Sequence, residues 1–171
     1  MKTVILGLGN TLLSDDGAGV LAARRLQTVI GKADDVDVVE SGWGGFRIID
    51  LLSGYDRAII IDAIKTGLQP VGYIHRVDGR ELVHSVRMVS FHDINFATAL
   101  EFAREMGIPM PGNVTVYAIE VAETEVFSEF ITPGVRRAIE ECVRQVLDEL
   151  SWHKPIEAEK NPERIWKTPE P

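Results

Sequence analysis

The apolar positions of the chain fall into short β-branched runs that alternate with stretches of helical spacing. Residues 2–8 form the first run, which ends in a glycine-containing turn, and this pattern predicts a strand followed by a loop. From Gly17 onward, apolar residues recur at intervals of three and four, which predicts an amphipathic helix. A second short strand is predicted over residues 36–40, closed by a loop at residues 41–45.

The central part of the chain carries the strongest sign of a buried sheet. Residues 58–61 read Ala-Ile-Ile-Ile, an uninterrupted apolar run that ends at Asp62. A strand needs such a run when both of its faces are covered, as they are in a mostly parallel sheet. Residues 46–52 before this run are compatible with a short helix, and residues 71–77 after it predict another strand.

The second half of the chain continues this alternation. A helix is predicted to open at residues 90–93, and a strand is predicted over residues 114–121, where apolar positions alternate. The clearest element is the last helix, for which Thr132 is the expected N-cap and Pro133 the first helical residue. The apolar stripe of this helix consists of Val135, Ile139, Cys142, Val143, Val146 and Leu150.

This order of elements predicts the fold class. Strands that alternate with helices form an α/β domain in three layers, in which helices flank a central, mostly parallel twisted sheet of about five strands. We expect a single domain over residues 1–150. After Leu150 the composition shifts to charge and proline, so that residues 151–171 are predicted to form a flexible tail.

Composition narrows the classes of function. The formal net charge of −8 argues against nucleic acid, whose phosphates need a basic face. No apolar run is long enough to cross a bilayer, and the amino-terminal residues lack a signal-peptide pattern. The single cysteine, Cys142, leaves no internal disulfide, which suits a reducing compartment. We therefore expect a cytoplasmic protein without membrane contact, and a monomer, since no exposed apolar stripe calls for a partner.

Three side chains are predicted to lie where the chemistry of such a fold gathers. In α/β sheets, ligands bind beyond the carboxyl ends of the strands. Asp16 follows the first strand, Asp62 ends the third, and His92 falls in the first turn of a predicted helix. The helix dipole there favours the neutral imidazole, the form that binds metal. Two carboxylates and one imidazole leave coordination positions open, as in a catalytic site for zinc, nickel or manganese.

Each of these residues also has a purely structural explanation. Asp15 and Asp16 are both suited to cap the helix that begins at Gly17, and Asp15 is equally compatible with a solvated position. Asp62 is suited to bond the backbone amides of the next turn. His92 would be satisfied by a neighbouring carbonyl at the helix entry. Because turn and cap roles are commoner for these residue types, the hypothesis of a metal site depends on their convergence at one edge of the sheet.

A nucleotide site is the competing interpretation of the opening motif. Gly-Leu-Gly at residues 7–9 follows a strand, and Glu40 ends the next strand, as in a dinucleotide fingerprint. Leu12, however, replaces the third glycine, and Asp15 and Asp16 would face an anionic pyrophosphate. We therefore expect no nucleotide cofactor. The sequence also lacks the Gly-x-Ser-x-Gly, His-Glu-x-x-His and Walker motifs.

Residues 7–20, Gly-Leu-Gly-Asn-Thr-Leu-Leu-Ser-Asp-Asp-Gly-Ala-Gly-Val, resemble the opening signature of the hydrogenase maturation proteases. The resemblance continues through Ile-Ile-Asp-Ala at residues 60–63 and Ser-Phe-His at residues 90–92, in the family's order and spacing. The loop at residues 41–45 looks like the family's glycine-containing loop, and residues 119–133 are similar to its closing region. The resemblance covers nearly all of the predicted domain.

The resemblance implies an endopeptidase that removes the carboxyl-terminal extension from the large-subunit precursor of a nickel-iron hydrogenase. The family's metal-contacting positions fall on Asp16, Asp62 and His92. These residues would bind nickel that the precursor already carries, so the metal is supplied by the substrate. Some relatives have glutamate at the first of these positions, and the aspartate here keeps the charge but shortens the reach. Trp43 is bulky where some relatives carry a small residue, which bears on the identity of the partner hydrogenase.

Two mechanisms and one alternative function are open at this stage. A metal-bound water is one candidate nucleophile, with the metal polarising the scissile carbonyl. In an aspartic-type mechanism, Asp16 or Asp62 would instead be the general base. The alternative function is a non-catalytic, metal-sensing chaperone of the same precursor, which would form a stoichiometric complex and create no new carboxyl terminus.

Overall fold

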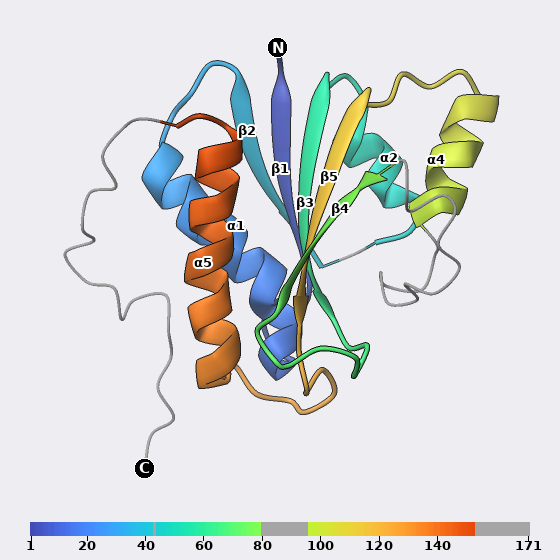
Figure 1. Cartoon of the computed structure of the whole chain (residues 1–171). Coiled ribbons are helices and arrows are strands. Elements are labelled where there is room, and N and C mark those ends of the chain that lie inside the picture. Colours follow the sequence, from blue (N-terminus) through green and yellow to red (C-terminus); the bar gives the residue numbers. More distant parts are fainter. Residues whose placement is uncertain (43, 80–95, 153–171) are drawn as a thin grey trace.

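A five-stranded sheet with the order β2-β1-β3-β5-β4 forms the middle layer of the protein (Figure 1). This computed structural model describes residues 1–42, 44–79 and 96–152. The first four strands in that order run parallel, and the edge strand β4 runs antiparallel to β5. The strands are β1 Thr3–Leu8, β2 Val36–Ser41, β3 Arg57–Ile64, β4 Ile74–Asp78 and β5 Asn113–Glu120.

Helices cover both faces of the sheet, which confirms the predicted three-layer α/β fold (Figure 1). Helices α1 and α5 pack on one face, and α2 and α4 lie on the other. The helices are α1 Ala18–Ile30, α2 Arg47–Leu52, α4 Phe96–Glu105 and α5 Pro133–Glu149, and the short 3-10 helix η1 covers Ser14–Gly17.

The strand bounds differ from the predicted ones in the middle of the chain. Strand β3 continues to Ile64, so Asp62 lies within the strand and does not end it. Strand β4 begins only at Ile74, because a turn closed by the Tyr73 amide and the Pro70 carbonyl precedes it. Strand β5 is buried on both faces beyond its first residue, so the alternation along it marks no solvent-exposed face.

The close approach of α1 to the sheet explains the glycines of the opening motif. A Cβ atom on Gly7 would lie 2.4 Å from the carbonyl oxygen of Gly19, and one on Gly19 would lie 2.2 Å from that of Ile61. Gly9 has a φ of +131°, which residues with side chains rarely adopt. The motif thus allows α1 to begin directly against the carboxyl ends of β1 and β3, and it places Asp16 at that edge.

Several predictions fall on residues outside those that the structure describes. These are His92 with the predicted helix start at residues 90–93, Trp43, and the tail from residue 153 onward. Helix α4 is described from Phe96 onward. No helix among the described residues is both long and apolar enough to cross a membrane.

Candidate functional site

Asp16 and Asp62 lie together at the carboxyl edge of the parallel strands. Asp16 belongs to η1, which packs against β3. Its side chain is half-buried, and its Oδ2 accepts a hydrogen bond of 2.8 Å from the Asn10 amide. This bond closes the loop after β1 over the carboxylate and so fixes the direction of the side chain.

Asp62 is a buried carboxylate in the central strand. Its neighbours two residues along the strand direction, such as Ile60, pack in the core beneath α2, so Asp62 faces the same side of the sheet. Its Oδ1 accepts a hydrogen bond of 2.8 Å from the Ala63 amide, a closer partner than the amides of the next turn. Burial raises the pKa of Asp62 well above its usual value, and the negative charge of Asp16 raises this pKa further, against the opposing Ala63 bond.

The site is defined by the buried carboxyl of Asp62 and the charge of Asp16, which acts on it. A carboxylate beside another carboxylate resists ionisation, and burial strengthens the effect because water no longer screens the charges. Such surroundings favour the protonated form of Asp62 or a cation bound beside it. The structure therefore brings two of the three predicted site residues together.

Asp15, next to Asp16, has a role that the sequence pattern did not predict. It is buried, and its two oxygens accept bonds from the Thr132 amide, at 2.8 Å, and from the Thr132 hydroxyl, at 3.0 Å. Burial raises the pKa of Asp15, while these bonds oppose the rise. The predicted solvated position of Asp15 is therefore wrong. Thr132 does precede α5 as expected, but its hydroxyl bonds Asp15 and not a helix amide.

A cleft of about 620 Å³ lies beside Asp16 at the ends of β1 and β2. Arg24 and Glu40 face each other across part of it, with Arg24 Nε 3.0 Å from Glu40 Oε2. Asn10, whose backbone amide bonds Asp16, also lines the cleft, so the cleft adjoins the loop that holds Asp16. The lining residues are Gly9, Asn10, Thr11, Val20, Arg24, Glu40, Ser41 and Gly42.

A histidine that the sequence pattern left without a role also lies near this edge. His75 in β4 pairs with Ala118, which pairs in turn with Asp62 in β3, so these side chains point to one side of the sheet. His75 Nε2 lies 3.1 Å from an oxygen of the buried Glu120. Glu120 also accepts bonds from Thr66, whose amide lies at 2.7 Å, and thereby holds the loop after β3. Only the strand register, which no local pattern encodes, brings these groups together.

Two of the three predicted metal ligands, Asp16 and Asp62, have the chemistry that a divalent metal ion binds. Carboxylate oxygens such as those of Asp16 and Asp62 bind hard and borderline cations. Within residues 1–42, 44–79 and 96–152, no three His, Cys, Asp or Glu side chains lie close enough to hold a metal ion. The third predicted ligand, His92, lies outside these ranges, so its position stays a prediction.

Comparisons with known proteins agree with this architecture. The structure resembles the hydrogenase maturating endopeptidase HybD from Escherichia coli, with a TM-score of 0.74, 26% identity, and coverage of 88% of this chain and 93% of that one. The Escherichia coli hydrogenase 2 maturation protease is 27% identical over 88% of this chain and 91% of its own length. The hydrogenase expression/formation protein HupD of Thiocapsa roseopersicina is 26% identical over 88% of this chain and 68% of its own length.

The fold is thus that of the hydrogenase maturating endopeptidases. The model of the family described as hydrogenase maturation protease matches residues 20–149, which is more than half of the chain. The chain belongs to the hydrogenase maturation protease family.

Proposed function

We propose that this protein is the endopeptidase that removes the carboxyl-terminal extension of the nickel-loaded large-subunit precursor of a nickel-iron hydrogenase. The observation that carries the proposal is the placement of the buried Asp62 carboxyl beside the charge of Asp16, at the carboxyl edge of the sheet in a member of this family. A protein of purely structural role gains nothing from this pair, because burying a second negative charge beside the first destabilises the fold.

The nickel in the precursor is the cation that this pair would recognise. Asp16, Asp62 and His92 would contact it, and the protease would bind the precursor productively only after nickel loading. Burial is the main cause of the raised pKa of Asp62, and the charge of Asp16 adds to it; a cation bound beside Asp62 would offset both effects, which supports this role. Nickel belongs to the substrate in this scheme, and the protease needs no resident metal.

The pair is suited to both routes of hydrolysis. In the aspartic-type route, ionised Asp16 takes a proton from the attacking water, and protonated Asp62 donates a proton to the reacting amide. In the metal-assisted route, both carboxylates are ionised and hold the precursor so that its scissile carbonyl lies at the cation. The cleft beside Asn10 would hold the peptide next to the scissile bond in either case.

Mass spectrometry of the processed precursor tests the proposal. Purified precursor, with and without nickel, is incubated with wild-type protein, with Asp62→Asn, and with Asp148→Asn as a matched control on the exposed side of α5. We expect loss of a defined carboxyl-terminal peptide from the nickel-loaded precursor only, with wild type and Asp148→Asn but not with Asp62→Asn. A tight complex in which wild type leaves the precursor intact would instead indicate the chaperone function.

A further inference from the structure

We propose that an exposed apolar surface beside the carboxylate pair is the docking site for the folded body of the precursor. This surface, termed the 126–130 surface, consists of Leu12, Val126, Phe127 and Phe130. The inference rests on the proposed function. It adds the place on this protein that binds the folded body of the substrate, as distinct from the place that binds the scissile peptide.

The exposure of these side chains calls for an explanation. Phe127 is 78% exposed, Val126 53%, Leu12 43% and Phe130 39%. Single exposed apolar residues are ordinary, but a group that includes two phenylalanines in one short segment is typical of an interaction site. Phenylalanine also presents a large contact area at a small cost in side-chain entropy.

The surface is built onto the same segment that carries Asp16. A parallel bridge joins Leu13 to Ser128, with the Ser128 amide donating to the Leu12 carbonyl at 2.9 Å and the Ser14 amide donating to the Ser128 carbonyl at 2.6 Å. The Ser14 hydroxyl donates to the Phe130 carbonyl at 2.9 Å. These bonds tie the 126–130 surface to η1, which carries Asp16.

The loop that carries the phenylalanines is also fixed in shape. The Glu123 carboxylate accepts bonds from the Glu125 amide, at 2.7 Å, and the Val126 amide, at 3.0 Å. Thr132, which follows the loop, is held by Asp15. A surface ordered before binding loses less entropy on association, which favours affinity.

Continuity and charge together identify the occupant. In Figure 1 the segment that joins β5 to α5 lies at the same end of the sheet as the start of α1, the end at which η1 holds Asp16. A protein whose carboxyl-terminal segment reaches Asp16 must therefore lie against this edge. Glu123, Glu125 and Glu129 flank the apolar side chains in the sequence, and Lys65 lies close enough to Glu123 to act on its charge, so these four side chains together are negative. The matching face of the precursor is thus apolar with basic side chains at its margin, whereas a second copy of this chain would oppose like charges.

Binding and kinetic measurements on the nickel-loaded precursor test this inference. Phe127→Ser removes the most exposed side chain of the 126–130 surface without touching Asp16 or Asp62. We expect its dissociation constant and its KM for the precursor to rise roughly tenfold or more, with kcat within about twofold of wild type. Glu125→Lys should slow association in low salt by a smaller factor.

Met106→Ser is the matched control, because Met106 is 63% exposed and follows α4 at the opposite edge of the sheet, before β5 begins. We expect it to bind and process like wild type. The inference is overturned if Phe127→Ser binds the precursor as tightly as wild type while wild type cleaves it, or if the substitution abolishes a dimer seen by light scattering and leaves precursor affinity unchanged. Failure of wild type to bind or cleave any precursor would overturn the proposed function together with the docking site.

Discussion

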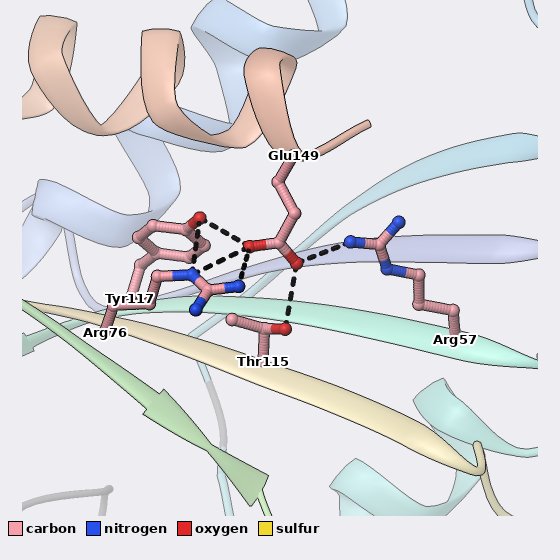
Figure 2. A network of polar contacts seen from close by, with 5 residues as sticks. All are labelled: Arg57, Arg76, Thr115, Tyr117 and Glu149. Carbon is pink, nitrogen blue, oxygen red and sulfur yellow. Dashed lines mark hydrogen bonds and ion pairs between the residues drawn. The ribbon is translucent and has the colours of Figure 1, made fainter. Parts of the chain in front are cut away.

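Two carboxyl groups, Glu149 and Asp62, lie at opposite edges of the same sheet and in opposite electrostatic surroundings. At the amino edge, Glu149 at the end of α5 accepts bonds from Arg57 Nη2 at 2.5 Å, Arg76 Nη2 at 2.8 Å, the Tyr117 hydroxyl at 2.6 Å and the Thr115 hydroxyl at 2.9 Å (Figure 2). At the carboxyl edge, Asp62 accepts a bond from the Ala63 amide and is repelled by the negative charge of Asp16.

The two environments shift the pKa values in opposite directions. Burial alone would raise the pKa of Glu149, but the bonds from Tyr117, Arg76, Arg57 and Thr115 outweigh it and lower the pKa to about 2. Burial raises the pKa of Asp62, and the charge of Asp16 adds to the rise. The amino edge therefore stabilises a fixed charge that fastens α5 to the sheet, while at the carboxyl edge ionisation of Asp62 costs stability.

The largest effect expected from this difference is on activity. Asp62→Asn should lower the rate of precursor processing at least about 100-fold if the proposed function holds, because the substitution removes the carboxyl group that both proposed routes use. Glu149→Gln should leave the rate per folded molecule within about twofold of wild type. Equal losses in the two variants, measured under conditions where both are folded, would contradict the division of roles between the edges.

For stability the order of the two variants should be reversed, with Glu149→Gln losing more than Asp62→Asn. Glu149→Gln weakens the charged bonds to Arg57 and Arg76 and leaves Arg57, which is largely buried, without its anion. We expect the free energy of unfolding to fall by about 2–4 kcal/mol, measured by urea denaturation. Asp148→Asn, an exposed acid next to it on the same helix, is the matched control and should change the free energy by less than about 0.5 kcal/mol.

The stabilisation by Glu149 should depend on pH, and the direction follows from its lowered pKa. The folded pKa of about 2 lies below the ordinary value of 4.5, so the folded state releases this proton more readily than the unfolded state. The stabilisation is complete above the ordinary value and is lost as the pH falls toward about 2. The stability curves of wild type and Glu149→Gln should therefore converge in acid, and a constant offset down to that pH would count against the network.

The elements of the fold are predictable from the sequence because their signals are local. The apolar run at residues 58–61 predicts the central strand, and the stripe from Val135 to Leu150 predicts α5, each from the period of burial. The exact end of β3 was not predictable, since the apolar run stops at Asp62 while the strand hydrogen bonds continue to Ile64. A charged residue after an apolar run predicts the end of the strand, because the run gives no sign of the backbone pairing that continues beyond it.

The site is predictable only where topology brings strand ends together. The rule that parallel strands present their carboxyl ends at one edge is sufficient to select Asp16 and Asp62, and their catalytic role stays a prediction. The bonds of Asp15 to Thr132 and of Glu149 to Arg57 join residues far apart in the sequence. They depend on strand register and on how α5 docks, which neither composition nor periodicity encodes.

Replacing Asp62 should stabilise the protein. The folded pKa of Asp62 is raised, so the folded state holds its proton more tightly, and stability falls as the pH rises from the ordinary value of 3.8 toward the folded pKa. Asp62→Asn lacks this ionisable group and should be more stable at neutral pH by about 1–2 kcal/mol. Thermal unfolding between pH 4 and 8 checks this, and the difference from wild type should shrink toward the acid end. A variant less stable than wild type at neutral pH would show that Asp62 is held by favourable bonds like those of Glu149.

The smallest effect concerns a single bond within the amino-edge network. Thr115→Val keeps the shape of a buried side chain but removes the hydroxyl that donates to Glu149 Oε1. Because Arg57 still donates to that same oxygen, we expect a loss of only about 0.5–1 kcal/mol in the free energy of unfolding. In the Glu149→Gln background the loss should be smaller still, since a neutral amide oxygen accepts more weakly than a carboxylate. A double-mutant cycle measures this coupling, and strict additivity would mean that the hydroxyl stabilises the sheet independently of the Glu149 charge.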